Sequence, residues 1–209
     1  MQVLAALEVL AVFTGILFYI WRWEHSHPYA WIPLLLIVLV SHFVHHDTLR
    51  SLGLGLHELR PSASLALPLA AWLLLPALAF GVARGSIVPA LPDLKSLHYF
   101  VNYLLWCVFQ QYLVQSFFHS RLMSLVASRH LSSLLVAAMF AAAHIPNDVL
   151  MAVTLAGGFV LAEIFARHRN IWPLALVQAV AGTLVAVLVP ATIIHNMRVG
   201  PGYFSYGGR

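Results

Sequence analysis

Long apolar stretches that carry almost no charge recur along the whole 209-residue sequence. A helix needs about 20 mainly apolar residues to cross the roughly 30 Å hydrocarbon core of a bilayer. About seven stretches approach this length, and we expect a transmembrane helix in each of them. They are about Val3–Ile20, Trp31–His45, Leu65–Ala83, Leu97–His119, Leu131–His144, Val149–Ala166 and Pro173–Ile194. The sequence therefore predicts an all-α fold, a polytopic transmembrane helical bundle of about seven spans.

Composition agrees with a membrane location and excludes several other classes of protein. Hydrophobic residues make up 61% of the chain and charged residues only 9%, whereas a soluble domain has about 25% charged residues. So few charges cannot cover the surface of a water-soluble globule, which excludes a cytosolic enzyme and a disordered chain. The 11 Lys and Arg residues are scattered singly, so we expect the lipid bilayer and no nucleic acid as a partner.

We expect a single membrane domain with three consecutive parts. Residues 1–96 form generic N-terminal transmembrane helices, residues 97–194 form core helices with the main polar groups, and residues 195–209 form an interfacial tail. The first stretch lacks the flanks of a signal peptide, so we interpret it as a retained helix. Arginines gather in the loops on the side of the N-terminus: Arg50, Arg60, Arg121, Arg129, Arg167 and Arg169. The positive-inside rule then predicts a cytoplasmic N-terminus.

The fourth stretch carries polar side chains at membrane depth, where they are costly and are the first functional candidates. They are Gln110, Gln111, Gln115 and His119. The last three are spaced four residues apart, so they fall near one face of a helix. Because polar groups that face lipid lose their hydrogen bonds, this face must point into the bundle or a hydrated cavity. Interhelical hydrogen bonding without catalysis is the alternative interpretation.

His144 ends a fifth stretch that is too short to cross the bilayer, since about 14 residues at 1.5 Å each give about 21 Å. Pro146 ends this helix, so His144 should lie at a helix end below the membrane surface. Irregular backbone at that depth requires protein or a water-filled cavity around it, which makes His144 a candidate proton carrier. A hydrogen-bonded structural histidine is the alternative. Asn147 or Asp148 can cap the next helix.

The last two stretches add fewer polar candidates. Glu163 has Arg167 four residues later, and we expect these two side chains to pair near the membrane interface. Gln178 lies within the first two turns of the seventh stretch, which begins at Pro173. Gly182 follows one turn after Gln178.

A histidine cluster ends the second stretch, with His42, His45 and His46 followed by Asp47. Spacing of three and four residues puts the histidines on one side of a helix, as a divalent metal site would require. The string His-x-x-His-His also resembles one box of the membrane fatty-acid desaturases, which need several such boxes, and the sequence has no second one. A metal-dependent lipid-modifying enzyme and a polar cap at the membrane interface are the two interpretations.

Three motifs follow one another on separate stretches of the C-terminal half, about Leu97–Ala186. Gln110–Gln115 has the spacing of Glu-Glu-x-x-x-Arg, and Phe140–His144 fits Phe-x-x-x-His. Gln178 and Gly182 have the spacing of a histidine followed four residues later by Asn or another small residue. In order and spacing these motifs resemble the CPBP family of intramembrane proteases, which includes CAAX proteases, bacteriocin-processing enzymes and Abi-like proteins.

The resemblance implies a role for each matching position. In the family, the first glutamate is thought to activate a water that attacks a peptide bond, and the other motifs support that water and the oxyanion. Gln110 or Gln111 would hold the water-activating position, Gln115 the arginine position, His144 the second-motif histidine and Gln178 the third-motif histidine. The resemblance implies no required cofactor, although a divalent metal is compatible with it, and we expect a bacterial inner membrane as the location.

The substitutions change the chemistry that such a site can perform. Glutamine has nearly the shape of glutamate but no accessible basicity, and losing a general base costs about 10²–10⁴-fold in rate. The first hypothesis is an endopeptidase for membrane-associated peptides or proteins, with His144 as base. Support would come from His119, Glu163, Gln115 and Phe140. The second hypothesis is an inactive pseudoprotease that binds a membrane-anchored partner as a scaffold, and the third is the metal-dependent enzyme built on His42, His45 and His46.

Overall fold

The computed structural model describes residues 1–24, 26–85 and 93–205, and within these ranges the chain is helical without strands. The N-terminal elements are α1 (Gln2–Phe18), η1 (Tyr19–Trp23), α2 (Trp31–Val44) and α3 (Leu59–Ala83). The central elements are α4 (Leu94–Gln111), η2 (Tyr112–His119), α5 (Ser120–Leu125) and α6 (Arg129–Ala142). The C-terminal elements are α7 (Asp148–Arg167), α8 (Trp172–Leu188), α9 (Ala191–Ile194), η3 (His195–Met197) and α10 (Pro201–Phe204).

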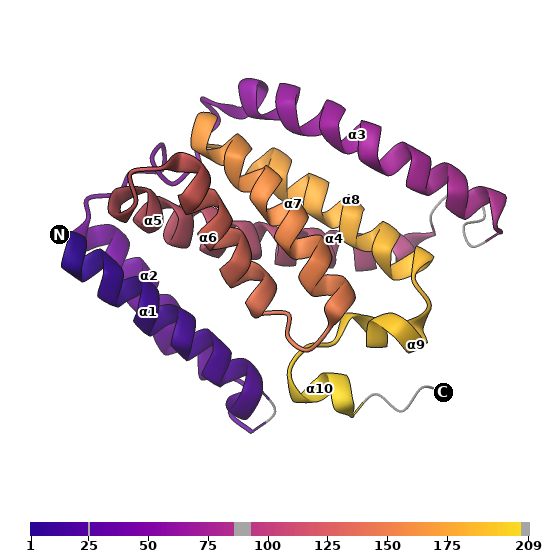
Figure 1. Cartoon of the computed structure of the whole chain (residues 1–209), viewed down its shortest axis with the longest axis horizontal. Coiled ribbons are helices and arrows are strands. Elements are labelled where there is room, and N and C mark those ends of the chain that lie inside the picture. The colour runs from indigo at the N-terminus through magenta and orange to yellow at the C-terminus, as the bar shows by residue number, and fades with distance from the viewer. Residues whose placement is uncertain (25, 86–92, 206–209) are drawn as a thin grey trace.

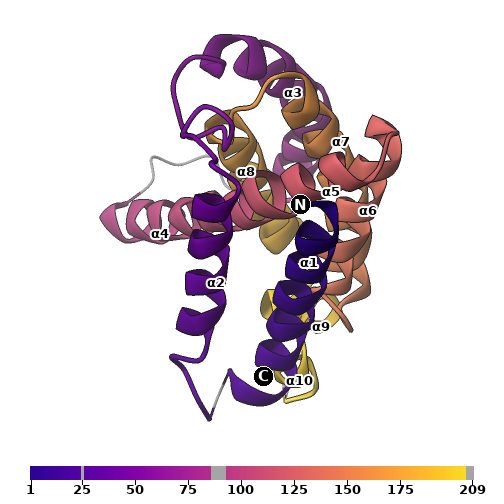
Figure 2. The same cartoon turned by 90° about the vertical axis from the view of Figure 1, so that its left-hand side faces the viewer.

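The helices form a bundle in which α6 packs on α7 and α8 packs against both α3 and α4 (Figure 1). The α1–α2 pair lies on one side of this bundle and contacts it through α5. Seen from that side, α4 crosses the direction of α1 and α2 instead of running along them (Figure 2). The N-terminal pair, α4 and α6 thereby surround a common space.

Helix starts follow the sequence signals closely. Asp93 caps α4 by accepting from the Ser96 N–H at 2.7 Å, and Ser128 caps α6 by accepting from the Leu131 N–H. Asn147 caps α7 by accepting from the Leu150 N–H, as the sequence predicted. Such caps satisfy backbone donors that a helix start leaves unpaired.

Among the described residues, fewer helices than the predicted seven have the length and apolar composition of a membrane span. Three described helices are long and apolar enough to cross a membrane: Gln2–Trp23, Leu59–Ala83 and Asp148–Arg167. A fourth arises if Trp172–Leu188 and Ala191–Met197 form one span, but the chain bends there by 116°. Pro190 lies between those two helices, where it cannot donate a helical hydrogen bond. The predicted span Pro173–Ile194 is therefore wrong as a single helix.

The remaining difference between the seven predicted spans and the helices of membrane-spanning length comes from shorter or less apolar helices. Each of α2 and α6 has 14 residues, which spans only about 21 Å. The fourth stretch is helical from α4 into η2, but its His, Asn and Gln side chains make it less apolar than a lipid-facing span.

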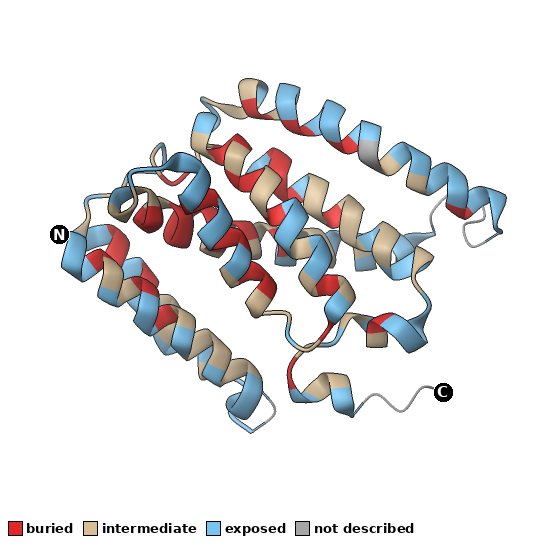
Figure 3. Cartoon of the chain, viewed as in Figure 1, coloured by how far each residue is buried: buried red, intermediate tan, exposed pale blue. Residues whose placement is uncertain are grey.

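Burial separates a packed interior from a lipid-facing surface (Figure 3). One apolar cluster joins Val12 of α1, Val38 of α2, Phe117 of η2 and Val136 of α6. On α3, by contrast, large apolar side chains such as Trp72 and Phe80 are exposed. An apolar surface of this kind suits acyl chains, so the all-α bundle is that of a membrane protein.

Candidate active site

Three glutamine side chains from two helices meet in a hydrogen-bonded chain. Gln111 Nε2 of α4 donates to Gln178 Oε1 of α8 at 2.6 Å, and Gln178 Nε2 donates to Gln110 Oε1 at 2.6 Å. We call these three residues the amide cluster. The structure thus brings together the first-motif and third-motif positions, which are 67 and 68 residues apart in sequence.

The members of the amide cluster differ in how far their side chains are buried. Gln111 is fully buried, and its Oε1 has no hydrogen-bond partner among the described residues. Gln110 is only partly buried and faces a cavity. An orphaned buried acceptor is unusual in a native structure and is suited to a bound water.

Gly182 lies one turn after Gln178 and is packed against another polar side chain. A Cβ atom at this position would collide with the Tyr103 hydroxyl of α4. The tyrosine hydroxyl therefore fills the space in which the third-motif partner side chain would begin.

His144 follows the end of α6 and has a fixed tautomer. Its Nδ1–H donates to the Phe140 carbonyl oxygen at 2.7 Å, and the two rings pack edge to face. Because a carbonyl oxygen only accepts, neutral His144 carries its proton on Nδ1 and keeps the lone pair on Nε2. This arrangement leaves Nε2 able to act as a base.

Gln110 and His144 line one large apolar cavity of about 810 Å³. The cavity lies between the α1–α2 pair and the α4–η2 and α6 segments. Its apolar walls include Val12, Phe13, Ile16, Leu34, Val38, Leu105, Leu113, Val136, Met139 and Phe140. Asn102 and Glu24 are further polar lining residues. The cavity can therefore hold a long apolar chain, and its lining also offers an amide and an imidazole.

The C-terminal segment closes the region around His144, which the sequence did not indicate. Gly200 N–H donates to the Ile145 carbonyl oxygen at 2.9 Å, and Val199 lines the cavity. Asn147 Nδ2 donates to the carbonyl oxygens of Ile194 and Arg198 at 2.8 and 3.1 Å. The buried Asn147 thus caps α7 and also holds the tail, and only the capping role has a local sequence signal.

Gln115 and His119 form a separate polar pair. His119 Nδ1–H donates to Gln115 Oε1 at 3.0 Å, and Ser132 and Ser133 lie at 3.5 and 3.4 Å from His119 Nε2. Both residues are fully buried and neither lines the cavity. They lie in the π-helical η2, and Gln111 lies at the end of the preceding α4. All three side chains are fully buried, so they point into the bundle as the sequence predicted, but only Gln111 joins the amide cluster.

Glu163 does not make the predicted pair with Arg167. Its carboxylate pairs instead with Arg129 Nε at 3.3 Å and His130 Nδ1 at 3.0 Å, at the start of α6. The close packing of α6 on α7 brings these partners nearer than the neighbour on the same helix. Glu163 also lies outside the lining of the cavity.

His42, His45 and His46 do not point toward a common centre. His42 Nδ1 pairs with Asp47 at 2.8 Å, His45 Nε2 pairs with Glu8 at 3.0 Å, and His46 is exposed in the turn after α2. Among the described residues, no group of three or more His, Cys, Asp or Glu side chains could hold a metal ion. This geometry gives the metal hypothesis no support.

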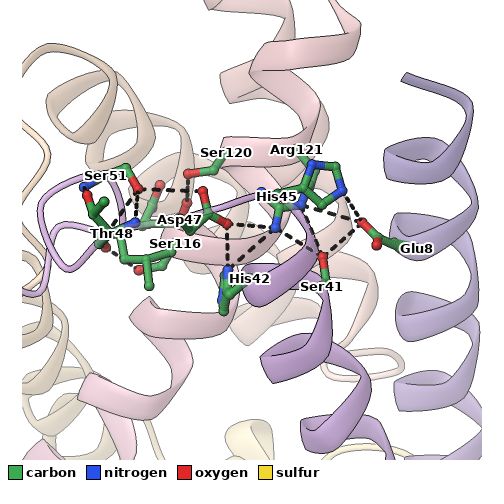
Figure 4. Close-up of polar contacts among 12 residues, drawn as sticks. Glu8, Ser41, His42, His45, Asp47, Thr48, Ser51, Ser116, Ser120 and Arg121 are labelled. Atoms are coloured by element: carbon green, nitrogen blue, oxygen red, sulfur yellow. Dashed lines mark hydrogen bonds and ion pairs between the residues drawn. The ribbon is translucent and has the colours of Figure 1, made fainter. Parts of the chain in front are cut away.

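Arg121 of α5 is the centre of this polar network, as Figure 4 shows. Its Nη2 donates to Asp47 Oδ2 at 2.7 Å, and its Nε lies 3.5 Å from Glu8 Oε2. It also donates to Ser41 Oγ, which in turn donates to Glu8. The buried guanidinium therefore ties α1 and α2 to α5.

The Asp47 carboxyl, which lies between α2 and α3, has a pKa below its ordinary value of 3.8. Burial alone would raise this pKa, but hydrogen bonds from Arg121 and His42 outweigh burial. Ionised Asp47 thus stabilises the fold fully at pH values above the pKa that its carboxyl has in the unfolded chain. That contribution is lost as pH falls through the lower native pKa.

Replacing Arg121 with leucine is expected to destabilise the protein by about 3–5 kcal/mol, because the partly buried carboxylates of Glu8 and Asp47 lose their buried cation. Unfolding in detergent micelles, followed by circular dichroism, measures the loss. The matched control is Arg60→Leu on the exposed surface of α3, which should change stability little. Equal stability of the Arg121 variant and the unmodified chain would contradict a stabilising role for the network.

The fold and the cavity define a helical membrane protein with an apolar cavity, and Gln110 of the amide cluster and His144 both line it. Residues 92–184 match the family model described as Rce1-like, type II CAAX prenyl endopeptidase. This match confirms the predicted resemblance to CPBP family proteases and covers the three motif positions. No curated protein and no solved structure was found to match the chain.

Proposed function

We propose that the chain is an intramembrane endopeptidase of the Rce1-like type that uses His144 as its base. One observation carries the proposal: His144 and Gln110 both line the same apolar cavity. A membrane-anchored substrate would place its lipid or apolar chain in the cavity and its peptide bond near these two residues. The matching family is described as a CAAX prenyl endopeptidase, and a prenyl group suits such apolar walls.

The proposed reaction needs one base and several hydrogen-bond donors. His144 Nε2 takes a proton from water as the water oxygen attacks the peptide carbonyl carbon, and an amide N–H stabilises the resulting oxyanion. The C–N bond then breaks, and His144 returns the proton to the leaving amine. The buried Gln111 Oε1, which lacks a described partner, supports the cluster as a holder of water.

A second function, binding of the same substrate without cleavage, is favoured by the amide cluster itself. Gln110, Gln111 and Gln178 hydrogen-bond one another, and none of them can accept a proton from water. A pseudoprotease of this kind would keep the cavity and serve as a membrane scaffold for a lipidated or transmembrane partner.

Filling the cavity tests the binding step that both functions share. Ala143→Phe adds bulk to a cavity-lining position, whereas Ala142→Phe adds the same bulk next to it, outside the lining. We expect Ala143→Phe to weaken binding of a farnesylated CAAX peptide by about 1–3 kcal/mol, roughly 5- to 150-fold. Fluorescence anisotropy on the full chain in lipid nanodiscs measures this.

Two outcomes would contradict the shared binding step. One is equal binding of the farnesylated peptide and the same peptide without the lipid. The other is an equal loss of binding in the Ala142 and Ala143 variants, which would indicate general damage to the fold.

A further inference from the structure

A second pocket, of about 410 Å³, lies away from the cavity, between the loop that precedes α3 and the end of α7. Its lining is polar and basic rather than apolar. The lining residues are Thr48, Arg50, Ser51, His57, Glu58, Ala166, Arg167 and Arg169. We call it the basic pocket.

Positive charge exceeds negative charge in the basic pocket. Arg50, Arg167 and Arg169 contribute guanidinium groups, and Glu58 is the one carboxylate among the lining residues. That carboxylate is engaged by His168 Nδ1 at 3.1 Å. The side chains of Arg50 and Arg167 are exposed and make no ion pair or hydrogen bond with any described residue. Two of the three cations are therefore free to bind an anion.

The backbone around the basic pocket is held in place by long-range hydrogen bonds. Arg169 Nη1 donates to the Ser51 carbonyl oxygen at 2.8 Å, and Asn170 Nδ2 donates to the Gly55 carbonyl oxygen at 2.7 Å. The Ile171 N–H donates to the Gly53 carbonyl oxygen at 3.0 Å. The loop is thus tied to the α7–α8 connection, so the pocket exists before any ligand binds.

One hydroxyl in the basic pocket has a hydrogen available for a ligand. Thr48 Oγ1 accepts from the Ser51 N–H at 3.1 Å, and its own hydrogen is not used in a described hydrogen bond. Guanidinium groups bind phosphate oxygens well, because they make paired, charge-assisted hydrogen bonds with them. A hydroxyl donor can add one more hydrogen bond to such an oxygen.

The position of the pocket relative to the spans indicates where the anion comes from. The membrane-length helices α3 and α7 have the ends Leu59 and Arg167 beside the pocket. Trp172, which donates its indole N–H to the Leu54 carbonyl oxygen, begins α8 nearby. Trp and Arg at the ends of apolar helices are typical of the headgroup level of a bilayer. These helix ends suit the depth at which the phosphates of a bilayer lie.

We propose that the basic pocket binds the phosphate group of an anionic phospholipid headgroup, held by Arg50, Arg167 and Arg169. Binding there fixes the C-terminal end of α7 and the start of α3 at the membrane surface. The site is independent of the cavity that contains His144, so it does not rest on the proposed peptidase function.

Native mass spectrometry of the full chain in detergent tests the proposal with dioleoylphosphatidylglycerol and dioleoylphosphatidylcholine as probes. We expect preferential binding of the anionic lipid. Each of Arg50→Gln and Arg167→Gln should weaken it roughly fivefold, and the double variant should weaken it further than either single variant. The matched control is Arg60→Gln, an exposed arginine at the start of α3 that does not line the pocket. Neither tested arginine has a described partner, so both variants should fold.

The outcomes distinguish a lipid headgroup from free phosphate as the ligand, and they include two results that would overturn the proposal. Persistence of the bound lipid in millimolar inorganic phosphate supports a headgroup ligand, and displacement by phosphate alone supports the site with free phosphate as its ligand. Equal binding of the two lipids without binding of phosphate would overturn the proposal. An equal loss of binding in Arg60→Gln would also overturn it, because surface charge in general would then explain the binding.

Discussion

Alanine in place of His144 is expected to lower the kcat/KM for cleavage of a farnesylated CAAX peptide by about 10²–10⁴-fold. The reason is that His144 Nε2 is the base we assign in the cavity, and its tautomer is set by the bond from Nδ1 to Phe140. Glutamine at the same position can keep a hydrogen bond to that carbonyl oxygen but has no basic nitrogen. We therefore expect His144→Gln to bind the peptide and to fail in cleavage.

Peptide cleavage by the full chain in nanodiscs, followed by mass spectrometry of the products, provides the measurement. His130→Ala is the matched control, because this histidine is exposed at the start of α6 and lies outside the cavity. Undiminished cleavage by both His144 variants would remove the base assignment. Peptide binding by the unmodified chain without any cleavage would instead establish the pseudoprotease function.

The fold class could be predicted because it depends on local composition and spacing. Apolar stretches predicted helices, and Asn147 and Pro173 marked helix starts correctly. The number of spans could not be predicted in the same way. The 116° bend near Pro190 and the π-helical turns of η2 depend on how neighbouring helices pack, and hydropathy alone does not contain that information.

The candidate site was predictable where motif spacing constrains it. The resemblance placed Gln110, Gln111 and Gln178 in one site, and their hydrogen bonds join them. Partners on distant helices were not predictable from spacing. Arg121 meets Glu8 of the first helix, and Glu163 prefers Arg129 over the Arg167 of its own helix. Such pairings follow from three-dimensional packing and have no periodic signal in the sequence.

Glutamate in place of Gln110 is expected to raise the rate of peptide cleavage by at least about 10²-fold, because it returns a general base to the site. The existing hydrogen bonds fit this change, since Gln110 already accepts from Gln178 Nε2 through its side-chain oxygen. The carboxylate introduced by Gln110→Glu can accept the same bond with no rearrangement. His144 would then share the proton transfers or serve to orient the water.

A glutamate at position 111 would require a rearrangement of the hydrogen bonds in the amide cluster. Gln111 donates to Gln178 Oε1, so a carboxylate there would face an acceptor unless the Gln178 amide turns over. After that turn, Gln178 Nε2 donates to residue 111 and Gln110 Nε2 donates to Gln178 Oε1, which satisfies all three side chains. We therefore expect Gln111→Glu to gain less than Gln110→Glu, because it lies deeper and requires this turn. In the double variant the two carboxylates would compete for the single amide NH2 group of Gln178.

Initial cleavage rates of the farnesylated CAAX peptide across a range of pH compare these variants. A new base at position 110 adds a rise in rate with pH that the unmodified chain lacks. Gln115→Glu is the matched control, because Gln115 pairs with His119 outside the cavity and a carboxylate there has no access to substrate. If neither single glutamate increased cleavage above the Gln115 variant, the amide cluster would not be the place where water meets the peptide bond. A gain confined to Gln110→Glu would instead identify the cavity-facing glutamine as the position from which the original base was lost.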